Sequence, residues 1–425
     1  MGTMNYQAGI QALTGLIRER SLLGPLRVMY QRVGRVFKIP LRAFHPYVVA
    51  GARANRQVLV SERGRVRWRN SDPVTDVLRR GVLVTDGTEH DAYRGLMESH
   101  LHPAALPGFT GIMISQTDRV TSAWQDGQTV DMLIEGRKIA LLIVMQTLFG
   151  VDAWDDLPRI WTPILKTIQH ISPGAWILWR RIPRPGFRKH LSDLDDYLYG
   201  IIHSRRGTAA RHDLLQHLID AGLDDDRIRD QMLTLLIAGH DTSTALLAWT
   251  FYLLGTNHDI HTRLVHELNE ALGSNPPGST LGWQPHILDY VLKESLRLYP
   301  PIHIGNRMVV EDMEFDGTRV PAGERLFYSI YLTHRDPEYW EDPEAFHPER
   351  FAGGRKTPPF AYVPFGGGPR ACIGAAFGQA EGRLVLARLL QTHGFEFINS
   401  NIHAHMGATL EPRPGVLMHV TKRGF

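Results

Sequence analysis

Hydrophobic positions repeat mainly with the period of an α-helix between residue 52 and about residue 299. Two short runs rich in β-branched and aromatic residues within 36–51 predict strands before this region. Strand-like patterns return in 307–315 and in 318–330. The pattern therefore predicts a mainly α fold with a small β region at one side.

The longest apolar helical pattern covers residues 226–255, a length that would also suit a bilayer. His240 and Asp241 lie near its centre, where a charged group is costly in lipid. The segment is therefore predicted to be a helix through the middle of a soluble core.

The same segment contains two residues that weaken a helix locally. Gly239 costs about 1 kcal/mol relative to alanine, and the Thr242 hydroxyl can donate to the carbonyl of Ala238 and disturb the backbone ladder. A close crossing with another helix would explain Gly239, and so would a need for open space beside the helix. The segment alone leaves both explanations open.

Composition favours one large domain over residues 1–425, because 43% of the residues are hydrophobic and no linker, low-complexity block or repeat divides the chain. The 47 Lys and Arg against 44 Asp and Glu give a net charge of +3, and the basic residues are scattered, which argues against nucleic acid as a partner. The single cysteine excludes an intramolecular disulfide and a multi-cysteine zinc site. We therefore expect a reducing, cytoplasmic compartment.

The first 60 residues carry nine Lys or Arg and one acid, Glu19, without the long apolar run of a signal peptide or membrane anchor. A solvated basic surface explains this composition, and so does weak contact with an anionic membrane. The expected location is therefore cytoplasmic, either free or peripheral to a membrane, with no transmembrane segment.

Charged residues cluster in two segments after the long helix. Glu294 and Arg297 are three residues apart on one predicted helical face and can pair. The proline-punctuated segment 334–351 offers Arg350 as a third member of a buried structural cluster, in which partners offset the desolvation of the carboxylate. An ordinary surface salt bridge would show the same spacing.

The segment 365–374, FGGGPRACIG, places Cys372 between a glycine-rich turn and a predicted helix. The amides and positive dipole of a helix N-terminus favour a thiolate. Cys372 could therefore be a nucleophile or a metal ligand, and for an isolated cysteine a small buried hydrophobic residue is a third explanation.

Taken together, these segments resemble the cytochrome P-450 family of haem-thiolate monooxygenases over nearly the whole chain. The glycine-rich segment matches the family's haem-loop pattern F-x-x-G-x-R-x-C-x-G at Phe365, Gly368, Arg370, Cys372 and Gly374. AGHDTS in the long helix, the E-x-x-R pair and PERF at 348–351 occur in the family's order. The resemblance implies the cytochrome P-450 fold, with haem buried between the long helix and the helix after the cysteine.

The resemblance also assigns the cofactors, which are haem b and O2. Cys372 becomes the iron ligand, with Phe365 packed near the sulfur and glycines that let the loop approach a flat porphyrin. The haem propionates fall to four cationic positions, two of which form a His-x-x-x-Arg pair. The implied cofactor-binding residues are His90, Arg94, Ala238, Gly239, Arg307, Phe365, Gly366, Arg370, Cys372 and Gly374.

The resemblance makes Asp241 and Thr242 catalytic residues that supply protons while dioxygen is activated. Ser243 stands where the family often has a second threonine, which is a conservative departure. These residues favour a monooxygenase. The alternatives are a haem-dependent peroxygenase or isomerase of the same fold and a non-enzymatic haem-binding sensor.

Apolar residues dominate the three segments that would face the substrate, so we expect a largely apolar lipid, terpenoid or steroid-like molecule. His303 and Asn306 could orient a polar end, and the aromatic run 172–186 corresponds to the family's mobile lid. Each pocket residue could instead be an ordinary core residue. The expected pocket residues are Val82, Leu83, Ala238, Ile302 and Ile304.

No G-x-G-x-x-G nucleotide-binding domain is recognisable in the chain. We therefore expect electrons from a separate ferredoxin or flavodoxin with its NAD(P)H reductase, and a monomeric enzyme. Arg94, Arg370 and Arg383 lie in segments near the cysteine side in the family, which predicts docking of an acidic electron donor there.

Overall fold

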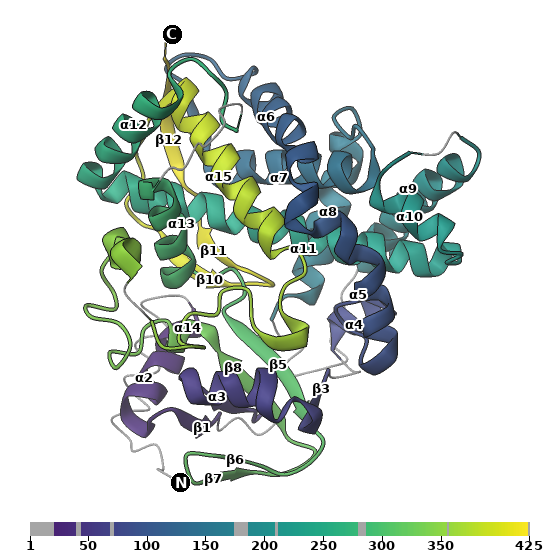
Figure 1. Cartoon of the computed structure of the whole chain (residues 1–425), viewed down its shortest axis with the longest axis vertical. Coiled ribbons are helices and arrows are strands. Elements are labelled where there is room, and N and C mark those ends of the chain that lie inside the picture. The colour runs from purple at the N-terminus through teal and green to yellow at the C-terminus, as the bar shows by residue number, and fades with distance from the viewer. Residues whose placement is uncertain are drawn as a thin grey trace.

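The computed structural model describes residues 21–39, 44–68, 72–173, 186–208, 211–278, 286–354 and 357–423. Helices dominate and small sheets lie among them, as predicted (Figure 1). The α-helices among these residues are α2 (Leu23–Val33), α3 (Ala52–Arg56), α4 (Pro73–Leu78), α5 (Gly87–Leu101), α6 (Pro107–Thr121), α7 (Met132–Phe149), α8 (Leu157–Ile171), α9 (Phe187–Arg206), α10 (Leu214–Asp220), α11 (Asp225–Thr256), α12 (His258–Leu272), α13 (His286–Leu298), α14 (Ile330–Thr333) and α15 (Ala375–Thr392).

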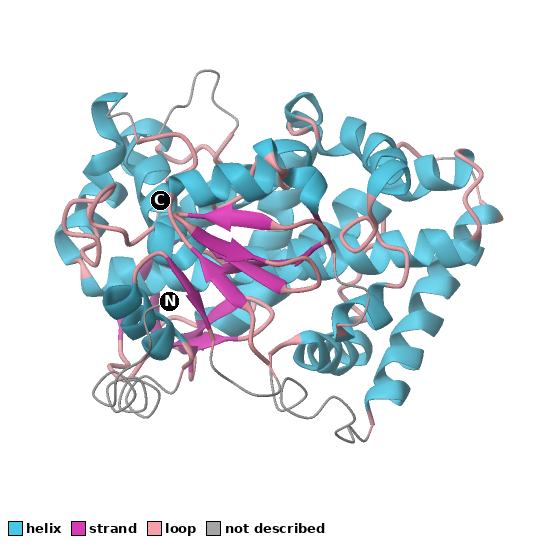
Figure 2. Cartoon of the chain, turned by 90° about the horizontal axis from the view of Figure 1, so that it is seen from below, coloured by secondary structure: helices cyan, strands magenta, loops and turns pink. Residues whose placement is uncertain are grey.

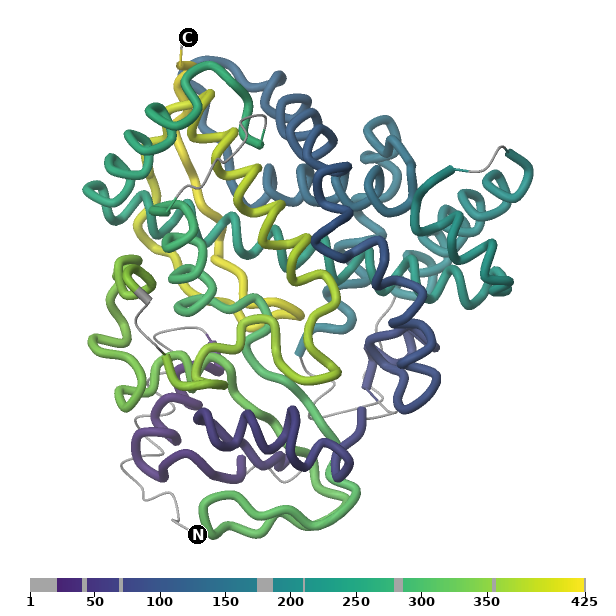
Figure 3. The backbone as a smooth tube through the Cα atoms, in the orientation of Figure 1, coloured from purple at the N-terminus to yellow at the C-terminus, as the bar shows by residue number. Residues whose placement is uncertain are grey.

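A five-stranded sheet joins two segments that are far apart in the chain, and Figure 3 shows them side by side at the bottom of the view. Its strand order is β1-β2-β8-β5-β3, with β2 parallel to β8 and the other pairs antiparallel. The strands predicted within 36–51 and 307–330 are therefore confirmed. The strands are β1 (Val36–Lys38), β2 (Tyr47–Val49), β3 (Val66–Arg67), β5 (Ile304–Val309) and β8 (Arg325–Ser329), and β6 (Met313–Phe315) pairs with β7 (Thr318–Val320).

The prediction of helices alone between 52 and 299 is wrong at β3 and at β4 (Thr129–Asp131), and the C-terminal strands were not predicted. β4, β12 and β9 form a three-stranded sheet, while β10 and β11 pair by themselves. Pairing with distant segments defines these strands, and propensity within a strand depends on such context. They are β9 (His393–Phe397), β10 (His403–Met406), β11 (Leu410–Arg413) and β12 (Leu417–Lys422).

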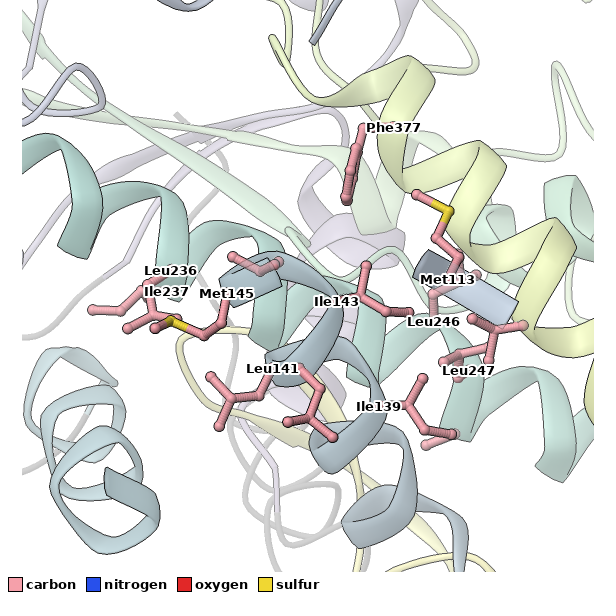
Figure 4. Packing of buried hydrophobic residues seen from close by; sticks show 14 of the residues in the cluster. Met113, Ile139, Leu141, Ile143, Met145, Leu236, Ile237, Leu246, Leu247 and Phe377 are labelled. Atoms are coloured by element: carbon pink, nitrogen blue, oxygen red, sulfur yellow. The ribbon is translucent and has the colours of Figure 1, made fainter. Parts of the chain in front are cut away.

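Helix α11 runs through the centre of the helical part and packs closely on α7. Helix α7 is apolar on almost every side, as expected for a helix surrounded by protein. Figure 4 shows α7 residues such as Ile139 and Ile143 among side chains of α6, α11 and α15. The predicted core helix at 226–255 is thus present, and it stays α-helical through its centre.

In the view of Figure 2, the helices lie around the strands. Helix α11 contacts the C-terminal strands β9 and β11. No helix among the described residues combines the length and apolar composition that a bilayer span needs. The N-terminal segment for which membrane contact was considered lies partly outside the described residues, which begin at residue 21.

Candidate functional site

The cysteine loop is a closed turn at the start of α15. The Cys372 amide donates to the Phe365 carbonyl at 2.8 Å, and the Gly366 amide donates to the Val363 carbonyl at 3.0 Å. Gly366 has φ +70°, a conformation that glycine adopts without strain. These two backbone hydrogen bonds therefore fix the position of Cys372 in the loop.

Gly368 is required by a neighbouring part of the chain. Its φ is +64°, and a Cβ at this position would collide with the backbone carbonyl of Leu59. Leu59 belongs to a single π-helical turn, Gln57–Ser61. The family resemblance implies that the loop glycines make room for a flat porphyrin, whereas at Gly368 the close neighbour is the protein's own backbone.

The Cys372 side chain is exposed, yet enough protein surrounds it for burial to raise the pKa of its thiol. The Gly374 amide and the Arg94 charge act in the opposite direction, as expected at a helix start, but burial outweighs them. A bound metal ion would deprotonate such a thiol. No group of three or more His, Cys, Asp and Glu side chains among the described residues could hold a metal ion.

Cationic side chains surround the loop. Arg94 of α5 donates to the Ala371 carbonyl at 2.8 Å, next to the cysteine. Arg370 donates to the Thr85 carbonyl and, at 2.6 Å, to Asp86. The structure thus brings both predicted arginines to the loop, and both already have partners within the protein.

Arg307 and His90, the other two predicted propionate ligands, lie within electrostatic reach of Arg370. Burial lowers the pKa of Arg370, and the charges of Arg307 and Arg94 lower it further, against the opposing effects of Asp86 and Asp91. Burial also lowers the pKa of His90, again with Arg370 and Arg94 contributing. Positive charges therefore disfavour one another here, and a ligand with two carboxylates would relieve that repulsion.

Helix α11 has an open face in the middle of its otherwise buried length. Ala238 is exposed and Thr242, one turn later, is half-buried, although the flanking residues of the helix are mostly buried. The Thr242 hydroxyl donates to the Ala238 carbonyl at 2.6 Å. Accessible surface on one face of a core helix shows that open space lies beside it.

Gly239 also serves the close crossing of two helices. A Cβ at Gly239 would come within 2.8 Å of the Val144 side chain on α7, closer than real contacts allow. The structural explanation of this glycine therefore holds, and it coexists with the open face formed by Ala238 and Thr242.

Asp241 lies on a different side of α11 and is buried. The Thr409 hydroxyl donates to its Oδ2 at 2.7 Å, and Arg137 Nη2 lies 3.7 Å from its Oδ1. Burial first and the neighbouring Glu411 second raise the pKa of Asp241 to about 6, although Arg137 opposes the shift. The sequence offered no signal for these three partners, because they come from α7 and the C-terminal strands.

Ser243 also has a partner that the sequence did not reveal. Its hydroxyl donates to Glu381 of α15, a carboxyl whose pKa burial raises to about 8. Ser243, the last residue of AGHDTS, thus faces the helix that follows the cysteine loop.

The predicted pocket residues divide into two kinds. Leu83 and Ile302 are 40% and 41% exposed, which is unusual for large apolar side chains. Val82 is buried in the main core, and Ile304 packs against a second apolar cluster beside the five-stranded sheet. For Val82 and Ile304, the explanation as core residues is therefore the better one.

Of the two polar residues expected at the pocket, one is buried and the other binds a neighbouring carboxylate. His303 is buried, and burial lowers its pKa to about 4. Asn306 donates to Asp72 at 2.8 Å. The expected lid, 172–186, lies mostly outside the described residues, which resume at residue 186.

Glu294, Arg297 and Arg350 meet in the interior. Arg297 binds both carboxylate oxygens of Glu294 at 2.7 Å, and Arg350 Nε donates to Glu294 Oε1 at 3.0 Å. Arg297 also donates to three backbone carbonyls between 334 and 345. The cluster therefore joins α13 to the loop before the cysteine.

Arg383, the third residue expected at the docking surface, forms a two-pronged ion pair with Asp289 at 2.8 and 3.0 Å. Asp86 and Asp289 thus offset the charges of Arg370 and Arg383, whereas Arg94 donates to a neutral carbonyl. Docking on this side stays a prediction.

The chain is similar to known proteins over most of its length. The family model for cytochrome P-450 matches residues 14–419. Cyclooctat-9-en-7-ol 5-monooxygenase of Streptomyces melanosporofaciens is 30% identical over 82% of this chain and 79% of its own. Pentalenene oxygenase of Streptomyces avermitilis is 30% identical over 84% and 83%.

A solved structure shares the fold. Retinoic acid-bound cyanobacterial CYP120A1 superposes with a TM-score of 0.85 and 27% identity, covering 94% of each chain. Together with the family match and the cysteine loop, this likeness identifies the protein's class. The chain belongs to the cytochrome P-450 family, which uses haem iron and O2, and it is a cytochrome P-450 monooxygenase.

Proposed function

We propose that this enzyme inserts one oxygen atom from O2 into a largely apolar, terpenoid-type substrate, using haem b and electrons from separate redox proteins. The observation that carries the proposal is the placement of Cys372 in a glycine-rich loop at the start of α15, with Arg94 bound to the neighbouring Ala371 carbonyl and Arg370 two residues away. The exposed Ala238 and half-buried Thr242 of α11 supply the open face that a substrate would need.

The described residues fit haem. Cys372 would hold the iron, and Arg94, Arg307, Arg370 and His90 would bind the propionates, whose negative charges relieve the repulsion among these side chains. When bound, haem supplies the iron at which dioxygen is reduced, and thiolate ligation favours cleavage of the O–O bond.

Thr242 and Asp241 are assigned the handling of protons. The Thr242 hydroxyl lies on the open face and, in the resting arrangement, directs its proton to the Ala238 carbonyl. The Asp241 carboxyl, with a pKa of about 6, carries a proton part of the time near neutral pH. A group with such a pKa can both accept and release a proton at the pH of a cell.

The proposed substrate class rests on two observations. Leu83 and Ile302 are exposed apolar side chains in segments expected at the pocket, and covering them with an apolar ligand contributes about 25 cal/mol per Å². The relatives named above are a pentalenene oxygenase and a cyclooctat-9-en-7-ol monooxygenase, and both names describe terpenoid substrates. A ferredoxin or flavodoxin with its NAD(P)H reductase is the proposed electron source.

A panel of compounds tests the proposal. Sesquiterpene and diterpene hydrocarbons, fatty acids and small charged molecules are added to the haem-loaded ferric enzyme, and the shift of the Soret band is measured. Binding compounds are then incubated with ferredoxin, reductase and labelled O2. We expect terpenes to shift the band and to gain one labelled oxygen atom. A response confined to small charged compounds would contradict the substrate class, and products without the label would contradict the monooxygenase reaction.

A pair of variants locates the pocket. Leu83→Asp introduces a charge at a proposed apolar wall and should weaken terpene binding by at least tenfold. Val310→Asp is the matched control, because Val310 is a similarly exposed apolar residue that follows β5. Equal effects of the two substitutions would remove Leu83 from the pocket.

A further inference from the structure

Two buried carboxylates share one guanidinium behind α11. Arg137 Nη2 of α7 donates a hydrogen bond to Oε1 of Glu411 on β11. The same nitrogen lies 3.7 Å from Oδ1 of Asp241, beyond hydrogen-bond distance. All three side chains are almost completely buried. Asp241 Oδ1 accepts no hydrogen bond from the described residues. Glu411 therefore has the stronger contact with the cation that both carboxylates need.

Other charged groups complete this network. Arg413 Nη2 donates to Glu411 Oε2 at 2.7 Å from the more exposed side, and its positive charge lowers the pKa of Asp241 slightly. His240 is fully buried and burial lowers its pKa to about 3, so its ring is neutral near pH 7. The Thr409 hydroxyl is the remaining polar contact of Asp241.

The outer end of the network reaches the surface. Arg137 and Arg413 line a hollow of about 510 Å³ between α7, α8 and the end of β11, together with Asp131 and Lys138. Solvent therefore approaches the two arginines, whereas Asp241 itself is covered. The charge around Asp241 is set by Arg137 and Glu411 more than by solvent.

We propose that Glu411 is a positioning residue that controls how often Asp241 carries a proton, because it holds the shared Arg137 in its own ion pair. The inference rests on the proposed function, in which Asp241 handles protons. Glu411 lies on β11, outside both the cysteine motif and the long helix.

The charges give the direction of the effect. Removing the Glu411 charge takes away a neighbouring negative charge and frees Arg137 Nη2 for Asp241 Oδ1, and both changes favour the ionised form of Asp241. Removing the Arg413 charge has the opposite effect, because one cation is lost and Arg137 becomes the only arginine left to Glu411. The two substitutions should therefore move the titration of Asp241 in opposite directions.

The experiment measures that titration directly. Infrared difference spectra of the haem-loaded ferric protein are recorded against pH, and the C=O stretch of protonated Asp241 is assigned as the band that Asp241→Asn removes. We expect Glu411→Gln to lower the midpoint by about one pH unit and Arg413→Gln to raise it by a smaller amount. Glu396→Gln, the same substitution at an exposed position on β9, should leave it unchanged.

Arg413→Gln protects the test against a folding failure, since the Arg413 side chain is 44% exposed and Glu411 keeps Arg137 as its ion-pair partner. An unchanged midpoint in Glu411→Gln overturns the inference, and so do shifts of the same sign in both variants. If Glu411→Gln does not fold, an unchanged or lowered midpoint in Arg413→Gln overturns it.

A second measurement separates this inference from the proposed function. Product formed per reduced nicotinamide is followed from pH 5.5 to 8 in the same variants. Burial and the neighbouring Glu411 raise the pKa of Asp241, and a lower midpoint leaves less of this carboxyl protonated at any given pH. We expect the yield of Glu411→Gln to decline at lower pH than that of the wild type. If Asp241→Asn keeps the full yield while the band still shifts, the proton role of Asp241 fails and the control by Glu411 stands.

Discussion

Truncating Glu294 to alanine removes the anion at the centre of the cluster that joins α13 to the segment 334–350. Its carboxylate accepts four hydrogen bonds, from Arg297 Nε and Nη2, Arg350 Nε and the His347 amide. Glu294 and Arg297 are completely buried, so water cannot replace the lost partner without rearrangement. We therefore expect loss of stability as the first effect of this substitution.

The contacts set the size of the effect. Breaking a buried ion pair on one side costs about 3 to 5 kcal/mol, because an uncompensated charge is left behind. Three backbone carbonyls still accept hydrogen bonds from Arg297, which places the expected cost toward 3 kcal/mol. Glutamine at position 294 keeps an accepting oxygen but not the charge, and we expect a loss of about 2 kcal/mol. Since proteins are stable by about 5 to 15 kcal/mol, both losses are large.

Urea unfolding followed by tryptophan fluorescence measures the free energy of unfolding, and the carbon monoxide difference spectrum measures haem content. Glu270→Ala is the matched control, because Glu270 pairs with His266 at the surface of α12 and both side chains are 71% exposed. The control should change stability by less than about 0.5 kcal/mol. A Glu294→Ala protein with unchanged unfolding and haem content, but slower turnover, would refute a structural role.

Three further predictions concern the haem site. Cys372→Ala should remove the strongly red-shifted Soret band of the reduced carbon monoxide complex, and a variant that keeps both haem and that band would contradict the assignment of the iron ligand. Thr242→Ala should keep haem and substrate binding but lower the product formed per reduced nicotinamide several-fold and release hydrogen peroxide. Thr242→Ser, which keeps the hydroxyl, should recover most of the yield. An unchanged ratio of product to nicotinamide in Thr242→Ala would show that another group directs the protons. Arg370→Gln should weaken haem retention at least tenfold, as measured by transfer of haem to apomyoglobin. Arg383→Gln is the control and should not weaken it, because the partner of Arg383 is Asp289. Equal transfer rates in the two variants would exclude Arg370 from propionate binding.

Local patterns predicted the elements that local chemistry defines. The 32-residue helix α11 follows from the long apolar helical pattern over 226–255, and the structure adds Asp224 as its N-cap, whose side chain accepts from the Arg227 amide. The strands at 36–51 and 307–330 follow from β-branched and aromatic runs. The Glu294 and Arg297 contact follows from spacing on one helical face, since residues three apart are neighbours there.

Contacts between distant segments could not be predicted in this way. Arg137, Thr409 and Glu411 approach Asp241 only because α7 and the C-terminal strands pack on the same side of α11. Gly368 is fixed by a carbonyl more than 300 residues earlier, at Leu59. Val82 and Leu83 are adjacent and equally apolar, yet one is core and the other exposed, and sequence pattern alone does not distinguish them.

The order of Asp241 and Thr242 in the chain has a geometric consequence for the proposed chemistry. Successive residues of an α-helix point about 100° apart, so neighbours in sequence face different surroundings. Thr242 faces the open space beside Ala238, where an apolar substrate would lie, while Asp241 faces Arg137 and Glu411 on the buried side. A carboxylate placed toward the open side would lose these partners and would bring charge to an apolar surface. Helix α11 therefore separates a charged proton-handling network from the substrate side, and the Thr242 hydroxyl is the polar group of this pair that reaches that side.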